Sequence, residues 1–300
     1  MSAFTETDKG AGNVLHLYTD QDLASPYVMS VFVALTEKGL PFELHTVDLT
    51  QRAQYAPEYV AISTTRRVPT LIHGDFVLSE SSAITEYLED LFPDHAIYPK
   101  NPQQRATARL VQAWLRSDFL PIRAERDTEV VFYGAQRTAL SDEARRSVDK
   151  LVAGVARLLP DGAQNLFGEY CIADTDLAMM LMRLVAHGDD LPAPLRAYAI
   201  HQWQRASVQA WVRHPWRCGL IAVNAACQYF ARNATRGSAD LFFGCAVAAF
   251  VALFASELAK SYFIAIARKC VKTDRTGKVV HNHLCSVGRM QICFAPEVGF

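Results

Sequence analysis

Cysteine is scarce in the first 212 residues of this 300-residue chain. Of the seven cysteines only Cys171 lies there, and the other six follow residue 212. A disulfide framework is therefore not expected in the first part, which is typical of a protein in a reducing cytosol. The polar stretch 1–12 lacks the apolar centre of a signal peptide. We expect a cytoplasmic protein with a flexible N-terminus.

Charge is also unevenly spread along the chain. Residues 1–212 hold 19 Lys and Arg against 27 Asp and Glu, whereas residues 213–300 hold 11 against 4. The acidic first part has no basic stripe, so nucleic acid is not an expected partner. The change of sign at the same place as the change in cysteine content predicts two segments of different kinds.

The apolar spacing up to residue 92 alternates between strand and helix periods. The turn dipeptide Gly74-Asp75 predicts a hairpin, and Gly39 ends the first predicted helix. The predicted order is β-α-β-α-β-β-α, with strands at 14–18, 42–49 and on both sides of the hairpin turn, helices at 26–38 and 81–92, and a part-helical segment at 51–65.

The segment 93–102 contains three prolines and is predicted to be a linker. Beyond it the pattern is helical only. We expect helices over about 103–129, 142–159, 174–187 and 198–212.

The turn Ser25-Pro26-Tyr27-Val28 lies between the first predicted strand and helix. Dithiol oxidoreductases carry two cysteines at such a junction, but here an oxygen and an aliphatic group replace them, so dithiol exchange is excluded. Ser before Pro is by itself an ordinary helix start. The free N–H groups of that helix start also favour anions, so a thiolate brought to Ser25 would be stabilised there.

Two further junctions have both a structural and a functional interpretation. Val68-Pro69 is either an edge-strand proline or a cis peptide that presents the Val68 backbone to an extended peptide. Glu80-Ser81 is either a common helix start or a pair that holds an amino-acid head group, with the amine on Glu80 and the carboxylate on Ser81.

These motifs together resemble a known family. S-P-Y after the first strand, V-P, E-S before a helix and "YPKNPQQRA" are similar to the cytosolic glutathione S-transferases. More narrowly, "TRRVP", "LSESSAITEYLED", "QAWLRSD", "GEYCIADTDLA" and "QWQRASVQ" resemble the bacterial YfcF-type transferases. The resemblance covers about residues 13–212.

The resemblance implies an α/β thioredoxin-like domain over 13–92, the linker 93–102 and an all-α domain over 103–212, usually as a homodimer. Glutathione would be the cosubstrate, no metal would be needed, and the second substrate would be a small electrophile, a peroxide or a disulfide. Such activities serve detoxification and the response to oxidative stress. The alternative is a non-catalytic binding or assembly module of the same fold.

The resemblance also assigns roles to residues. Ser25 would donate a hydrogen bond to the glutathione sulfur, Val68 would pair with the cysteinyl backbone beside a cis Pro69, and Glu80 and Ser81 would hold the γ-glutamyl end. Arg67 is a further candidate for glutathione binding, with a solvated basic pair beside Arg66 as the alternative. For the electrophile the candidates are Trp114, Phe119 and Tyr133, each with ordinary core packing as its alternative.

One position departs from the family pattern. Cys171 stands where the family usually has a Ser or Thr helix cap, with Asp174 three residues later. Because a thiol caps poorly, we expect a local loss of stability there and no effect on catalysis.

Residues 213–300 form an atypical, cysteine-rich and basic tail. The run 241–256 is apolar but shorter than the ~20 residues of a spanning helix, so membrane contact through 241–267 is an alternative that we do not favour. His281, His283 and Cys285 lack a second spaced pair, so no metal site is expected. The abrupt change in pattern favours the hypothesis that the tail is non-native sequence, such as a shifted reading frame.

Overall fold

The computed structural model describes residues 14–160, 162–215, 272–273 and 279–280. The first of these ranges begins with a mixed sheet in the order β2-β1-β3-β4. The parallel neighbours β1 and β2 are followed by β3 and β4, which form the predicted antiparallel hairpin. The strands are β1 (Leu15–Asp20), β2 (Phe42–Val47), β3 (Thr70–His73) and β4 (Phe76–Ser79).

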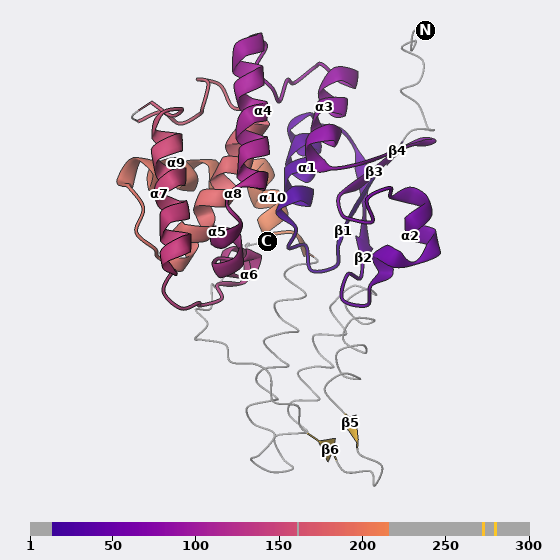
Figure 1. Ribbon diagram of the computed structural model, residues 1–300. Coiled ribbons are helices and arrows are strands. Elements are labelled where there is room, and N and C mark those ends of the chain that lie inside the picture. Colours follow the sequence, from indigo (N-terminus) through magenta and orange to yellow (C-terminus); the bar gives the residue numbers. More distant parts are fainter. Residues whose placement is uncertain (1–13, 161, 216–271, 274–278, 281–300) are drawn as a thin grey trace, which may run out of the picture.

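Helices cover both faces of this sheet. Helices α1 (Pro26–Glu37) and α3 (Ser81–Leu91) lie between the sheet and the helical domain, and α2 (Pro57–Ile62) lies on the opposite side, after the short 3₁₀ turn Ala53–Tyr55 (Figure 1). The predicted order β-α-β-α-β-β-α is confirmed, and the fold is thioredoxin-like.

The second domain is helical. Its centre is α8, which is buried along most of its length and packs against α4, α9 and the α1 helix of the first domain (Figure 1). Its helices are α4 (Pro102–Ser117), α5 (Leu120–Glu125), α6 (Thr128–Tyr133), α7 (Asp142–Ala156), α8 (Ile172–His187), α9 (Ala193–Trp203) and α10 (Ala206–Val212).

The structure divides two helices that the sequence predicts to be continuous. The segment 103–129 is broken at two places. Pro121, which lacks an N–H donor, lies in the first turn of α5 and cannot continue α4, and the Asp127 carboxylate caps α6 by accepting from the Glu129 and Val130 amides. The segment 198–212 is broken at Arg205, whose backbone is extended and whose guanidinium pairs with Glu37 of α1 at 2.7 Å.

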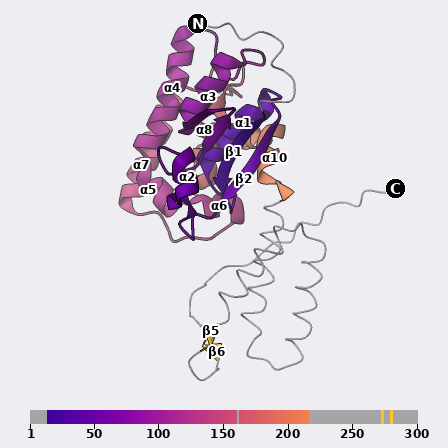
Figure 2. The same ribbon diagram turned by 90° about the vertical axis from the view of Figure 1, so that its right-hand side faces the viewer.

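The last helix of this domain returns to the first. Figure 2 shows α10 beside α1. The fully buried Trp211 ring lies 5.2 Å from that of Phe32, and Ser207 donates a hydrogen bond to the Glu37 carboxylate. The two domains therefore share a continuous apolar core, which fixes α1 against the helices of the second domain.

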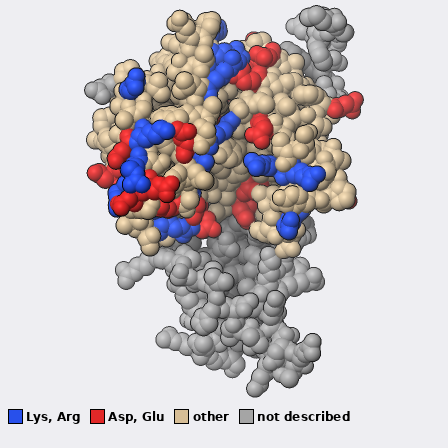
Figure 3. Space-filling view, viewed as in Figure 1, with Lys and Arg blue, Asp and Glu red and all other residues tan. Residues whose placement is uncertain are grey.

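Acidic and basic side chains mix on the surface of the helical domain. On the face in Figure 3 they alternate over the left side. Ion pairs in this domain join Arg137 to Asp127 and Glu129, and Lys150 to Asp118. Each is at least partly exposed and so stabilises the fold weakly.

Most of the tail lies outside the described residues, including 241–267, His281, His283 and Cys285. The described exceptions are 213–215 and two strands, β5 (Lys272–Thr273) and β6 (Val279–Val280), which pair antiparallel. Within the described ranges no helix combines the length and apolarity needed to cross a membrane. The membrane and non-native hypotheses for the tail stay predictions.

Candidate functional site

Ser25 lies where β1 turns into α1. It is the N-cap of α1, and its hydroxyl oxygen accepts a hydrogen bond from the Val28 amide at 3.3 Å. The turn is fixed by the buried Asp20 carboxylate, which accepts from the Ala24 amide at 2.7 Å and the Ser25 amide at 3.0 Å. Because the Ser25 oxygen is the acceptor in the cap, its own proton remains available for donation to a ligand.

Val68-Pro69 is a cis peptide bond, as one of the two interpretations predicts. Pro69 directly precedes β3, and the antiparallel register of β3 with β1 places Val68 opposite the end of β1, where the Ser25 turn begins. The Val68 N–H makes no hydrogen bond with the described part of the chain. It is therefore available to an extended ligand.

Glu80 and Ser81 form the start of α3. Glu80, not Ser81, is the N-cap; it is exposed, makes no capping hydrogen bond and has a φ of 76°, which is uncommon for a residue with a side chain. Backbone outliers of this kind concentrate at ligand-binding positions. Ser81 is the first helical residue and is buried.

Arg116 joins these two helix starts. Its guanidinium donates to the hydroxyls of Ser81, at 2.9 Å, and Ser82, at 2.5 Å, and lies 5.7 Å from the centre of the Tyr27 ring. The starts of α1 and α3 are therefore neighbours, and a cation from α4 adds to the field of both helix ends. Such a field favours an anionic head group at Ser81.

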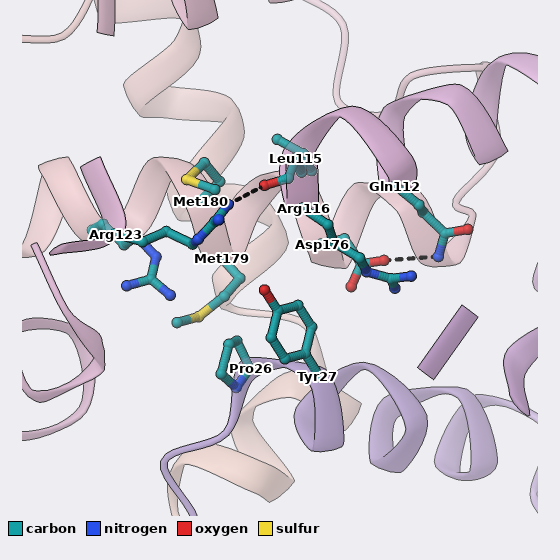
Figure 4. Close-up of a pocket in the computed structure, with 10 residues that line it drawn as sticks. Pro26, Tyr27, Gln112, Leu115, Arg116, Arg123, Asp176, Met179 and Met180 are labelled. Carbon is teal, nitrogen blue, oxygen red and sulfur yellow. Dashed lines mark hydrogen bonds between the residues drawn. The ribbon is translucent and has the colours of Figure 1, made fainter. Parts of the chain in front are cut away.

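A pocket opens beside this site, between α1, α4, α5 and α8. In Figure 4 the Tyr27 ring projects from the start of α1 toward Met179 of α8 and Arg116 of α4. Its floor is apolar, with Met180 and Leu115 beside Met179. The full lining is Pro26, Tyr27, Gln112, Leu115, Arg116, Arg123, Asp176, Met179, Met180 and Arg183.

The polar part of the pocket is mainly cationic. Three arginines line it against one carboxylate, and that carboxylate, Asp176, accepts from Gln112 Nε2 at 2.8 Å. Arg183 is buried; its Nη1 donates to the Arg126 carbonyl, while its Nε has no partner among the described residues. Burial lowers the pKa of Arg183. An anion in the pocket would compensate this poorly solvated cation.

Several predicted residues lie elsewhere. The Arg67 side chain is exposed, and its carbonyl accepts from the hydroxyls of Tyr59 at 2.8 Å, Thr70 at 3.2 Å and Ser63 at 3.4 Å. Trp114 packs edge-on against the buried Phe119, and neither lines the pocket. Tyr133 donates to the Asp22 carbonyl in the loop before Ser25, so it contacts the site's backbone and not the pocket.

Sequence reasoning missed Arg116, Arg123 and Arg183. The signal for Arg116 was present, since Gln112 and Arg116 are four residues apart and so share one face of α4. Nothing in the sequence indicates that Arg183, inside the central helix α8, faces a pocket rather than solvent.

At the start of α8, Asp174 completes the helix cap that begins at Cys171. The Asp174 carboxylate accepts hydrogen bonds from the Cys171 amide at 2.9 Å, the Leu166 amide at 2.8 Å and the Tyr198 hydroxyl at 2.7 Å. Burial raises the pKa of the Cys171 thiol, so it stays neutral and unreactive.

Comparison with known proteins agrees with this architecture. Residues 21–96 match the model of the glutathione S-transferase N-terminal domain, and residues 101–215 match that of the C-terminal domain. The chain belongs to the glutathione S-transferase family.

Similar proteins come from several kingdoms. A solved glutathione transferase homologue from Burkholderia GL BGR1, with bound glutathione, is 44% identical over 66% of this chain and 96% of its own, with a TM-score of 0.56. A glutathione S-transferase from Triticum aestivum is 30% identical over 58% of this chain and 74% of its own. Glutathione S-transferase 1 from Dianthus caryophyllus is 32% identical over 48% of this chain, which spans 63% of that protein.

Proposed function

We propose that this protein is a glutathione transferase in which Ser25 activates the thiol of glutathione. The observation that carries the proposal is the position of the Ser25 hydroxyl, which accepts the Val28 amide at the start of α1 and keeps its own proton for a ligand. Bound glutathione in the structure of the 44% identical Burkholderia homologue supports the same cosubstrate.

The other residues of the proposed site would orient glutathione. The γ-glutamyl carboxylate would lie at Ser81, near the Arg116 guanidinium, with the amine on the exposed Glu80 carboxylate. The cysteinyl backbone would pair with Val68 beside the cis Pro69. The sulfur then reaches Ser25, because the Val68 segment lies opposite the end of β1.

At Ser25 the hydroxyl donates to the sulfur and the helix end favours its negative charge. A drop of ~2 units in the thiol pKa corresponds to about 2.7 kcal/mol, within reach of one such hydrogen bond and a helix end. The thiolate attacks an electrophilic atom, its electron pair forms the new bond from sulfur, and the leaving group departs with the electrons of the bond that breaks.

The pocket chemistry favours an electrophile with an apolar body and an anionic group. Met179, Met180 and Leu115 suit the body, and Arg116, Arg123 and Arg183 suit the anion. Peroxides and disulfides are alternative second substrates for the same thiolate. Parallel assays with an electrophile, a peroxide and a disulfide would separate transferase, peroxidase and disulfide-reducing activity.

We also propose a cytoplasmic homodimer. The edge strand β4 exposes Phe76 and Val77, and α4 exposes Leu110. Exposed apolar side chains on an edge strand are usually covered by a partner, and a second copy of the chain is the simplest one. Light scattering of the purified protein would test this.

The decisive experiment is an ultraviolet titration of bound glutathione from about pH 5 to 9, covering the pKa range of a thiol lowered by ~2 units. We expect a thiolate band well below the pKa of the free thiol in the wild type, and a higher apparent pKa in Ser25→Ala. Ser147→Ala on α7 is the control and should titrate like the wild type. Binding without a lowered pKa would favour the non-catalytic module, and no binding would overturn the site.

A further inference from the structure

A cluster of two imidazoles and one carboxylate lies on the sheet face that carries α2. His16 is on β1, and Glu43 and His45 are on the parallel neighbour β2. The register pairs His16 with Glu43, and Tyr18 with His45, so these side chains share one face. Figure 2 looks onto this side of the sheet, with α2 nearest the viewer.

The three potential ligand atoms converge. His16 Nδ1 lies 3.0 Å from His45 Nε2 and 3.3 Å from a Glu43 carboxylate oxygen, and His45 Nε2 lies 3.6 Å from the same oxygen. Tetrahedral Zn²⁺ with bonds of about 2.0–2.1 Å has neighbouring ligands roughly 3.3 Å apart. The three observed separations bracket that value, so the atoms match one face of a coordination tetrahedron.

A hydrogen bond between the two imidazole rings is the simpler explanation of their close approach. It does not provide a partner for every acceptor atom of the cluster. At 3.0 Å the two facing nitrogens have room for only one proton between them. One proton thus serves three acceptor atoms, whereas a cation would engage all three lone pairs.

We propose that His16 Nδ1, His45 Nε2 and the Glu43 carboxylate bind one divalent transition-metal ion of the Zn²⁺ type, with water in the fourth position. The two imidazole ligands favour Zn²⁺ and similar transition-metal ions over Mg²⁺ and Ca²⁺, which prefer oxygen ligands throughout. The side chains of His16 and His45 are 34% and 36% exposed, so an ion enters directly from solvent.

The role of this ion is structural. It joins β2, the edge strand, to β1, on the opposite side of the sheet from the α1 and α3 helix starts that form the glutathione site. The proposal is therefore independent of the proposed transferase activity. The sequence does not reveal this cluster, because its ligands lie on two strands and the two histidines are 29 residues apart, with no local spacing that marks them.

Isothermal titration of the chelator-treated full chain with Zn²⁺ tests the proposal. We expect one equivalent to be lost, or weakened about 100-fold or more, in His16→Ala and in His45→Ala, since even outer-sphere partners of a metal contribute 10–100-fold. Glu43→Gln should weaken binding about 10-fold. The exposed His201→Ala, on α9, is the matched control and should bind as the wild type does.

Two further measurements separate this site from other ligands in the chain. The tail carries six cysteines, whose Co²⁺ complexes show thiolate charge-transfer bands, whereas the proposed N₂O site shows only ligand-field bands. The ligand-field bands should vanish in His16→Ala/His45→Ala. Zn²⁺ should also raise the melting temperature of the wild type more than that of Glu43→Gln, whose site is exposed enough to leave folding intact.

Equal Zn²⁺ stoichiometry and affinity in the wild type, Glu43→Gln and the double variant would overturn the proposal. Loss of the equivalent in His201→Ala would do the same, because the ion would then lie elsewhere.

Discussion

The proposed glutathione subsite and the neighbouring pocket are built in different ways. The subsite uses the ends of segments: the cap of α1, the residue before β3 and the cap of α3. The pocket uses the interior faces of helices, chiefly α4 and α8, which are separated in sequence and meet only after folding. The first kind of site is specified by local backbone geometry, and the second by helix packing.

A buried ion pair supports the proposed glutathione subsite, and another supports the pocket. Lys38 at the end of α1 contacts Glu89 of α3 at 2.7 Å and the Phe92 and His95 carbonyls, which fixes α1 to α3 behind the proposed glutathione subsite. On the pocket side, Arg126 forms a bidentate pair with Asp189 at 2.5 and 2.7 Å, and the Arg126 carbonyl holds Arg183. The two pairs provide a way to perturb each side separately.

The largest effect should come from Lys38→Met. The Lys38 side chain is fully buried and Glu89 nearly so, so the variant leaves an unpaired buried carboxylate. We expect the free energy of unfolding to fall by about 3–5 kcal/mol, measured by urea denaturation. Lys150→Met, which breaks an exposed pair with Asp118, is the matched control and should change little. Equal effects of the two variants would contradict the assigned role of Lys38.

The contrast between the two sites explains what could be predicted. Ser25, Val68-Pro69 and Glu80-Ser81 were found because caps, prolines and strand ends have short-range signatures. The helix boundaries near Pro121 and Arg205 were missed because one depends on a break inside an apolar pattern and the other on a contact with Glu37, 168 residues away. Arg183 was missed because a pocket-facing arginine inside a buried helix has no local signature.

Asp189→Asn should lower the free energy of unfolding by an amount that depends on pH. Burial alone would raise the pKa of Asp189, but the hydrogen bonds and charge of Arg126, with His187, outweigh it, so the pKa lies below its ordinary value. A depressed carboxyl pKa adds stability above the unfolded pKa of ~3.9, and this is lost as pH falls through the folded value.

We therefore expect the variant to be about 2–3 kcal/mol less stable near neutral pH, with the difference shrinking below roughly pH 4. Denaturation of both proteins across this range is the measurement. The neighbouring exposed Asp190→Asn should show no such trend. A difference for Asp189→Asn that stays constant with pH would rule out the ionic contribution.

Arg123→Gln should change the selectivity of the pocket and leave the glutathione side intact. Arg123 keeps one nitrogen on the Leu115 carbonyl and has others available to an anion. We expect kcat/KM to fall about 10-fold for an electrophile with a carboxylate, and to change little for its uncharged methyl ester. The exposed Arg157→Gln is the control for a general loss of positive charge. Equal losses for both electrophiles would show that Arg123 does not select the anion.

The smallest effect concerns the cap at Cys171. In Cys171→Ser, a hydroxyl replaces the thiol and accepts the α8 amides better, while Asp174 keeps its three hydrogen bonds. Against this gain stands the burial of a more polar group, so we expect a net rise in unfolding free energy of about 0.5–1 kcal/mol. Cys171→Ala removes the same sulfur without adding an acceptor and should be no more stable than the wild type. If the Ser and Ala variants unfold alike, Asp174 alone completes the cap. The family's usual Ser or Thr would then be unnecessary at this helix start, and the sequence pattern of the cap would be a poor guide to stability in the helical domain.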